Sequence, residues 1–149
     1  MNDVYGQCSC GSVAYRFTAD KLIAYQCHCS ICRKVTGSAF STTLMAPERS
    51  FSWLRGEDLV SSYAKENGYR NNFCSRCGSP VPNKFRDYPL FNVPVGSIES
   101  GPPVEIAAQI FMGSRAHWDS SALGGRQYDE MPSLDEMLEL LGITASLND

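Results

Sequence analysis

The chain has 149 residues, a length that suits one domain with a sizeable buried core. Its formal net charge of −3 argues against nucleic acid as a partner, and the lack of a long apolar run argues against a membrane span. The first residues show no secretory signal, so we expect a cytoplasmic location, where thiols stay reduced. We expect a single domain over residues 1–149, as a monomer or homodimer.

Short segments rich in β-branched and aromatic residues recur between turn signals along the chain. Val13, Tyr15 and Phe17 alternate as one face of a strand does. A short helical turn is expected over residues 30–35, ended by Gly37. Further strands are expected over residues 22–26, 40–45, 59–64, 68–73, 81–85, 90–95 and 105–111.

Turn and cap signals refine this pattern. Asn67-Gly68 predicts a hairpin, because this dipeptide favours the tight turns that join antiparallel strands. Ser133 followed by Glu136 matches a capping box, and Gly142 ends the helix that it begins. The apolar face of this helix consists of Leu134, Met137, Leu138 and Leu141. The sequence therefore predicts a mainly β fold with a short C-terminal helix, followed by a frayed tail over residues 144–149.

The seven cysteines are the main chemical signal. They fall in three clusters, which are Cys8-Ser9-Cys10, Cys27-His28-Cys29-Ser30-Ile31-Cys32 and Cys74-Ser75-Arg76-Cys77. An odd number of cysteines in a reducing compartment indicates metal ligands rather than a disulfide framework.

The third cluster is typical of a zinc knuckle, since two residues separate Cys74 from Cys77 and Gly78 follows directly. Gly78 can take the positive φ that lets backbone amides approach the two thiolates. A redox pair of the thioredoxin type is the rival interpretation, but it needs a βαβ context that this sequence lacks.

A structural zinc needs four ligands, and the first cluster can supply the other two. Cys8 and Cys10 share one face of an extended segment, and Gly6 and Gly11 let the backbone bend around an ion. We therefore predict one structural Zn²⁺ held by Cys8, Cys10, Cys74 and Cys77.

The middle cluster then has three thiols, Cys27, Cys29 and Cys32, for a second Zn²⁺ with an open fourth position. Three protein ligands and one exchangeable position are the arrangement expected of a catalytic zinc. Such a site should hold metal less tightly than a closed one, so its zinc can be lost on purification. Two alternatives stay open: His28 is the fourth ligand, or the three are ordinary buried thiols. A side chain between Cys27 and Cys29 on a strand points to the opposite face, which argues against His28.

These motifs resemble the glutathione-dependent formaldehyde-activating enzyme family, which includes centromere protein V. The matching segments are Gly6-x-Cys8-x-Cys10-Gly11, Cys27-His28-Cys29-Ser30-x-Cys32-Arg33-Lys34-x-x-Gly37-x-Ala39-Phe40, Phe73-Cys74-x-x-Cys77-Gly78-Ser79 and, toward the C-terminus, residues 109–118 and 128–132. The resemblance implies a β-tent fold of antiparallel sheets with a structural zinc and a second zinc, sharing the seven cysteines as above. It also implies carbon–sulfur lyase or synthase chemistry, in which the thiol of glutathione adds to formaldehyde.

The expected partner is therefore a small thiol such as glutathione. Arg33 and Lys34 are the candidate substrate-binding residues, because they would offset the negative charge of a zinc thiolate centre and could bind a substrate carboxylate. They could equally be two solvated surface cations. The alternative function is a non-enzymatic binding module, stabilised by zinc, in which both metal sites are structural.

Overall fold

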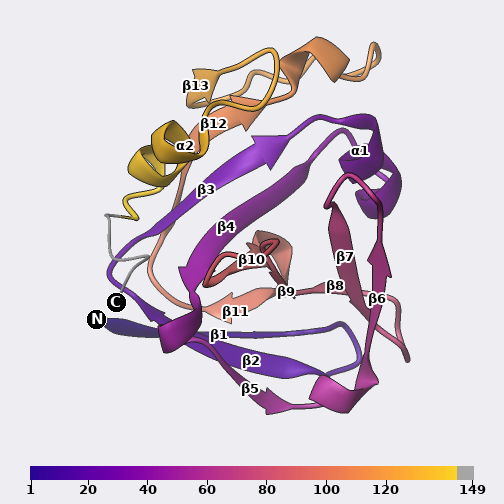
Figure 1. Cartoon of the computed structure of the whole chain (residues 1–149), viewed down its shortest axis with the longest axis vertical. Helices are drawn as coiled ribbons and strands as arrows, with labels where there is room; N and C mark the ends of the chain where they lie inside the picture. The colour runs from indigo at the N-terminus through magenta and orange to yellow at the C-terminus, as the bar shows by residue number, and fades with distance from the viewer. Residues whose placement is uncertain (144–149) are drawn as a thin grey trace. The chain divides into compact units, whose positions relative to one another are not determined.

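The computed structural model describes residues 1–143 and shows a mainly β fold with two short α-helices in that range (Figure 1). The predicted tail over residues 144–149 lies outside the described residues. The chain divides into two compact units, Met1–Leu22 with Met45–Pro103, and Ile23–Leu44 with Val104–Asp149. A single folding domain over residues 1–149 stays a prediction.

The first unit contains a four-stranded sheet with the strand order β11-β1-β2-β5. Its members are β1 (Asn2–Gln7), β2 (Ala14–Ala19), β5 (Ser52–Arg55) and β11 (Ile98–Ser100). Within β2 the predicted alternation is present at Tyr15 and Phe17, which are 0% and 1% exposed on either side of the exposed Arg16, whereas Val13 is buried just before the strand begins. The Tyr15 ring also stacks on that of Phe51, which precedes β5. One face of this sheet therefore forms the apolar core of the unit.

The first unit also contains a three-stranded sheet, β6-β7-β8, and the antiparallel pair of β9 and β10. These strands are β6 (Val60–Ala64), β7 (Arg70–Cys74), β8 (Pro80–Val81), β9 (Asn83–Lys84) and β10 (Leu90–Pro94). The hairpin predicted at Asn67-Gly68 joins β6 to β7, and Gly68 has a φ of 89°. The strand predicted over residues 81–85 is instead two strands of two residues each, because Pro82 between them has no N–H for a ladder.

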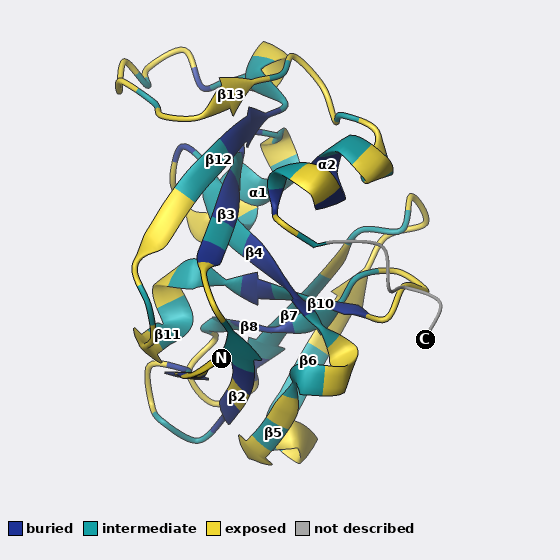
Figure 2. Ribbon diagram, turned by 90° about the vertical axis from the view of Figure 1, so that its left-hand side faces the viewer, coloured by how far each residue is buried: buried dark blue, intermediate teal, exposed yellow. Residues whose placement is uncertain are grey.

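The second unit contains β13, β12 and most of β3 and β4, in that order across the sheet. Their bounds are β3 (Leu22–Cys27), β4 (Ser41–Pro47), β12 (Val104–Ile110) and β13 (Arg126–Gln127). Figure 2 shows β12 passing from exposed at its first residues to buried at its last three. The buried end of β12 is hydrogen-bonded to His28, the residue that follows β3. The backbone N of His28 donates to the Ile110 carbonyl oxygen at 3.0 Å.

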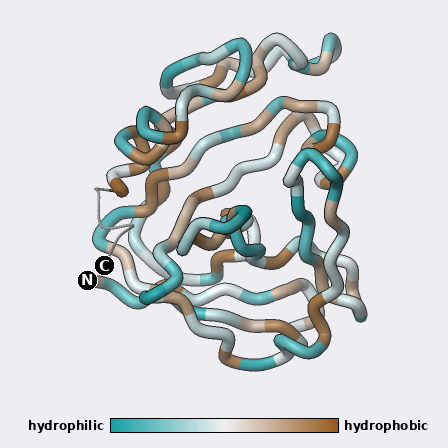
Figure 3. The backbone as a smooth tube through the Cα atoms, viewed as in Figure 1, coloured by the Kyte–Doolittle hydropathy of each residue, from teal (hydrophilic) through white to brown (hydrophobic). Residues whose placement is uncertain are grey.

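The two predicted helices are both present in the second unit. Helix α1 (Ser30–Thr36) ends at Gly37, which has a φ of 62°. Helix α2 (Leu134–Leu140) alternates hydrophilic and hydrophobic residues along its turns (Figure 3). Ser133 Oγ accepts from the backbone N of Glu136 at 3.2 Å, as the capping box predicts. The Glu136 carboxylate accepts instead from the Tyr128 hydroxyl at 2.6 Å, so the side chain of this box ties α2 to the segment after β13.

Four 3₁₀-helices complete the described elements: η1 (Glu48–Ser50), η2 (Glu57–Leu59), η3 (Val95–Ser97) and η4 (Met112–Ser114). Within residues 1–143, the structure has no helix with the length and apolar character needed to cross a bilayer.

Candidate metal centres

Four cysteine sulfurs come together in the first unit from two segments that are far apart in the sequence. Cys8 and Cys10 lie in the turn after β1, Cys74 ends β7, and Cys77 lies in the turn that follows. All four Sγ atoms lie within 4.8 Å of one another, with 3.6 Å between those of Cys8 and Cys10. This set, the Cys₄ group, contains the residues that the spacing predicts, and it could hold a metal ion.

The backbone around the Cys₄ group is shaped to present these sulfurs. Gly78 has a φ of 75°, the conformation predicted for it. The backbone N of Val13 donates to Cys8 Sγ at 3.3 Å, a contact that stabilises a thiolate. The backbone N of Ser9 donates to Ser79 Oγ at 3.0 Å, and this bond ties the two turns together without any metal.

The Cys₄ group has a buried side and a solvent side. Cys8 and Cys74 are 2% and 0% exposed. Cys10 and Cys77 are exposed. Hydrogen bonds from Ser79 lower the pKa of Cys77 to about 5, so this thiol is ionised at neutral pH. The surroundings of Cys77 therefore favour the charged form that binds metal.

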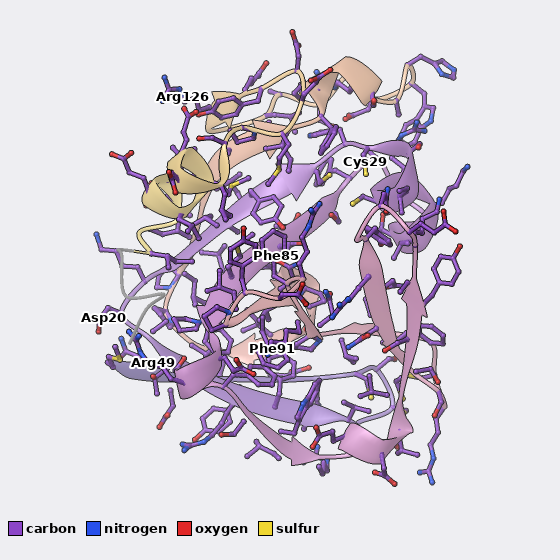
Figure 4. All side chains as sticks on the ribbon, in the orientation of Figure 1. Asp20, Cys29, Arg49, Phe85, Phe91 and Arg126 are labelled. Atoms are coloured by element: carbon purple, nitrogen blue, oxygen red, sulfur yellow. The ribbon has the colours of Figure 1, made fainter. Side chains whose placement is uncertain are left out.

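Three more cysteine sulfurs come together in the second unit, where β3 leads into α1. Cys27 ends β3, Cys29 is the N-cap of α1, and Cys32 lies in the first turn of that helix. Their Sγ atoms all lie within 4.8 Å of one another, and Figure 4 labels Cys29 at the start of α1. We call this set the trio, and it too could hold a metal ion.

Hydrogen bonds within the trio shift the pKa values of its thiols in opposite directions. Bonds from Cys27 and Cys32 hold the pKa of Cys29 far below its ordinary value. Bonds to Cys29 and Cys32, together with burial, hold the pKa of Cys27 far above its ordinary value. Three adjacent thiolates repel one another, so they cannot all be charged unless a cation lies between them.

Both groups fit zinc in their donor chemistry. Four thiolates form a common structural zinc site, whereas hard cations such as magnesium prefer oxygen ligands. Within residues 1–143, no histidine, aspartate or glutamate donor joins either group. An ion bound by the trio in tetrahedral geometry would therefore keep one position that no such side chain fills.

His28, which the sequence leaves open as a fourth ligand, lies apart from the trio's sulfurs. The side chain is 0% exposed, and its Nε2 atom lies 2.7 Å from Oε1 of Gln109 on β12. Its ring packs against Phe40 with 5.1 Å between the ring centres. The His28 side chain therefore lies on the face opposite Cys27, as the alternation of side chains along a strand predicts.

Hydroxyl side chains share the face of β3 and β4 that carries Cys27. Tyr25 pairs with Thr43 across the two strands, and Cys27 pairs with Ser41. The Tyr25 hydroxyl is hydrogen-bonded to Thr43, and Ser41 is hydrogen-bonded to the Cys32 thiol. Burial raises the pKa of Tyr25 far above its ordinary value, and the nearby Cys27 thiol adds to this rise. Tyr25 is therefore a protonated phenol beside the trio.

Sequence reasoning missed three of these neighbours. Tyr25 could have been found, because residues two apart on a strand share a face and Cys27 is two residues on. Ser41 depends on the register between β3 and β4, which no single segment specifies. Gln109 lies 81 residues from His28, and no local pattern links the two.

The two cations predicted to bind substrate have different surroundings, although they are neighbours on α1. Arg33 is half-buried, and its Nε atom is buried without a hydrogen-bond partner among residues 1–143. Lys34 is exposed. The Arg33 side chain is therefore packed against its surroundings, whereas the Lys34 side chain is solvated.

The fold and the two cysteine groups together define a mainly β protein with two centres that could each hold a metal ion. The model of a family described as "Glutathione-dependent formaldehyde-activating enzyme" matches residues 3–114, a span that contains all seven cysteines. The chain belongs to this family.

Two known proteins extend this comparison. A protein of Halomonas elongata with the provisional name glutathione-dependent formaldehyde-activating enzyme is 30% identical over 82 residues. The match covers 51% of this chain and 52% of the relative, so the chain spans about half the length of the curated relative that it matches. A crystal structure of a Rhodobacter sphaeroides protein has a TM-score of 0.54 and 24% identity, covering 66% of this chain and 91% of that chain. This second likeness concerns the fold alone.

Proposed function

We propose that this protein is a zinc-dependent enzyme of carbon–sulfur chemistry. It joins a small thiol of the glutathione type to an aldehyde such as formaldehyde, and it catalyses the reverse cleavage. The family and the name of the Halomonas elongata relative support this class of substrates. The observation that carries the proposal is the trio itself, three converging thiols that no fourth histidine or carboxylate donor joins among the described residues. A cytoplasmic location belongs to the same proposal, because both centres need reduced thiols.

The proposal assigns one zinc ion to each cysteine group. The structural ion is held by Cys8, Cys10, Cys74 and Cys77, and the second ion by Cys27, Cys29 and Cys32. When bound by the trio, zinc would promote the deprotonation of a substrate thiol that takes the open position. Because the trio offers fewer donors than the Cys₄ group, the second ion is the one more easily lost on purification.

The reaction balances without any further reagent. The new bond joins sulfur to the aldehyde carbon, the carbonyl π bond breaks, and the proton released by the thiol ends on the oxygen. The Tyr25 phenol lies on the trio's face of the strand pair, and as a protonated donor it can stabilise negative charge on that oxygen. Arg33 is the proposed partner for a carboxylate of the thiol substrate, since it is a half-buried cation on α1, the helix that begins at the trio.

The test follows the metal's sulfur coordination in the full chain. Protein with zinc in the Cys₄ group and cobalt in the trio is titrated with glutathione. We expect the X-ray absorption spectrum of cobalt to gain one sulfur neighbour. We also expect faster exchange between free and thiol-bound ¹³C-formaldehyde in NMR. A cobalt spectrum that shows a fourth protein ligand, or that no small thiol changes, would favour the binding module with two structural ions.

A variant pair tests the phenol separately. Tyr25→Phe should slow the exchange by about a hundredfold, the usual effect of removing one donor to a developing oxyanion. Tyr63→Phe is the matched control, because Tyr63 is 56% exposed on β6. Equal exchange rates in the two variants would remove Tyr25 from the mechanism and leave the metal chemistry in place.

A further inference from the structure

A chain of hydrogen bonds, buried at its His28 end and part-buried beyond it, runs on the face of β3 opposite to Cys27. The Nε2 atom of His28 lies 2.7 Å from Oε1 of Gln109, and both residues are 0% exposed. The amide nitrogen of Gln109 donates to Oε1 of Gln26 at 2.7 Å and to the carbonyl oxygen of Gly124 at 2.8 Å. The amide of Gln26 in turn donates to Thr42 Oγ1 at 3.1 Å. The chain thus joins β3, β4, β12 and the loop before β13.

The donor count in this chain fixes which atom of His28 carries the proton. A glutamine amide has two N–H donors, and Gln109 uses both of them on Gln26 and Gly124. Its oxygen can only accept, so His28 must donate from Nε2. The Nε2 lone pair is therefore absent, and this nitrogen cannot bind a metal while the bond to Gln109 lasts.

His28 is also held by its backbone and by its ring. Its backbone N donates to the Ile110 carbonyl oxygen at 3.0 Å, and its ring packs against Phe40. Its Nδ1 atom is buried without a hydrogen-bond partner among residues 1–143. An unpaired buried acceptor costs about 1–3 kcal/mol, so the contacts on the other side of the ring keep it where it is.

The position of His28 in the chain gives these contacts a consequence for the trio. Cys27 and Cys29 are its immediate neighbours. The two peptide groups that flank His28 therefore set the distance between the Cα atoms of the two cysteines and the directions of their side chains. Fixing the His28 ring at Gln109 and its backbone at Ile110 leaves these peptide groups little freedom to turn. Partners outside the ligand set commonly orient ligands in this way, and their loss weakens metal binding.

We propose that His28 is a positioning residue for the trio, held by the hydrogen-bond chain through Gln109 and Gln26, and that it sets the sulfur spacing without binding metal itself. The inference rests on the second metal site of the proposed function. It goes beyond that site by assigning a role to three residues that touch neither the ion nor the substrate.

Two substitutions of His28 separate the hydrogen bond from the ring. In His28→Gln the amide nitrogen is the same number of bonds from the backbone as Nε2, so this variant can still donate to Gln109. In His28→Asn the side chain is one bond shorter, and the donor cannot reach. Neither variant keeps an imidazole, so a difference between them reports the reach of the side chain to Gln109 and not the loss of the ring.

The readout is the affinity of the full chain for its first and second equivalents of zinc, measured by competition with a chelator. We expect the first equivalent, in the Cys₄ group, to bind all three proteins alike. His28→Asn should bind the second equivalent about 10–100-fold more weakly than the wild type, and His28→Gln should bind it nearly as tightly. The cobalt spectrum of the trio should change in His28→Asn and not in His28→Gln.

Three results would overturn the proposal. The first is a His28→Asn protein that binds the second equivalent as the wild type does. The second is a weakening of both equivalents together. The third is a His28→Gln protein that loses as much as His28→Asn, which would make the imidazole ring, and not its hydrogen bond, the group that the trio needs. A wild type that binds only one equivalent would contradict the proposed function as well, which separates the two failures. If His28→Asn does not fold, Thr42→Val cuts the far end of the chain with an isosteric side chain. This variant should bind the second equivalent of zinc more weakly than the wild type does and the first equivalent with the same affinity. If Thr42→Val binds both equivalents with wild-type affinity, His28 has no positioning role.

Discussion

The Cys29 sulfur accepts a hydrogen bond from the backbone N of Cys32 at 3.3 Å, so one side chain caps α1 and also belongs to the trio. Serine is a good N-cap, whereas it is a poor ligand for zinc because it keeps its proton at neutral pH. The cap and the metal ligand can therefore be separated by substitution.

Cys29→Ser should lose one metal equivalent and keep the fold, because the serine oxygen can take over the cap. Cys29→Ala should lose the same equivalent and also about 1 kcal/mol of unfolding free energy in the metal-free protein. Metal analysis and urea unfolding measure the two effects. A Cys29→Ser protein that still binds two equivalents would contradict the assignment of this residue as a ligand.

Cys77→Ser tests the structural ion without opening a cavity, because Cys77 is exposed. With zinc present, its urea midpoint should fall to that of chelator-treated wild type, and the protein should unfold or aggregate at lower denaturant. In metal-free protein the substitution should change the unfolding free energy by less than about 0.5 kcal/mol. Ser75→Ala, also exposed in the same turn, is the control and should behave as the wild type. Equal midpoints for zinc-loaded Cys77→Ser and wild type would count against a structural ion.

Gly6 is required because there is no space for a side chain beside it, and the register between β1 and β11 is irregular at this residue. Its φ is not positive, but a methyl group there would overlap the Tyr15 ring and lie 2.7 Å from the Ser97 carbonyl oxygen. Gly6→Ala should therefore destabilise the protein by about 1–3 kcal/mol in thermal or urea unfolding. Gly96→Ala is the matched control, since a methyl group there meets nothing within 4 Å, and it should be neutral or slightly stabilising. Similar losses in both variants would show that the Tyr15 contact is not the cause.

Burial raises the pKa of Tyr15 to about 12, although its hydroxyl is hydrogen-bonded to Ser97 at 2.7 Å. In the unfolded chain a tyrosine titrates near pH 10, so between about pH 10 and 12 the unfolded state releases a proton that the folded state keeps. The stability that this group contributes is complete below pH 10 and is lost as the pH rises through 12, by about 3 kcal/mol.

Tyr15→Phe should remove this alkaline loss of stability. Below pH 10 the variant should be about 1 kcal/mol less stable, because the bond to Ser97 is lost. Its stability curve should then cross that of the wild type at higher pH. Urea unfolding at several pH values measures both curves, with the exposed Tyr63→Phe as control. Parallel curves for Tyr15→Phe and wild type would exclude Tyr15 as the titrating group.

Arg33 and Lys34 should differ in their effect on the thiol substrate. Arg33→Gln should raise KM for glutathione at least tenfold with little change in kcat, because a uniform binding contact is lost. Lys34→Gln should change KM by less than about threefold, since an exposed cation contributes little. Esterified glutathione, which lacks free carboxylates, should bind both variants and the wild type alike. Equal KM values for the two variants would argue against a specific role of Arg33.

Local signals in the sequence predicted the elements that depend on a few adjacent residues. The turn at Asn67-Gly68 and the cap at Ser133 are both present, because each acts within its own segment. β1 was not predicted, since its strand character comes from pairing with β2 on one side and β11 on the other. The Glu136 side chain likewise bonds to Tyr128, a partner that the capping pattern does not specify.

The cysteine groups could be predicted because thiol spacing and ligand number constrain each other. The structure brings together the same two sets, while their roles as zinc ligands stay predictions. What surrounds them could not be predicted in the same way. Gln109 reaches His28 only through the pairing of strands far apart in the chain, and the unsatisfied Nε of Arg33 depends on burial that no pattern reports.

The order of the cysteines along the chain means that the two ions would restrain the unfolded chain to different extents. An ion held by the Cys₄ group would close a ring of chain from Cys10 to Cys74, and the whole trio lies within that ring. Ring closure removes conformations from the unfolded ensemble, and a long ring removes more than a short one. An ion in the trio would close only the short loop from Cys27 to Cys32, so it would restrain the unfolded chain very little. The site proposed for catalysis thus lies inside the segment of chain that the other ion would cyclise.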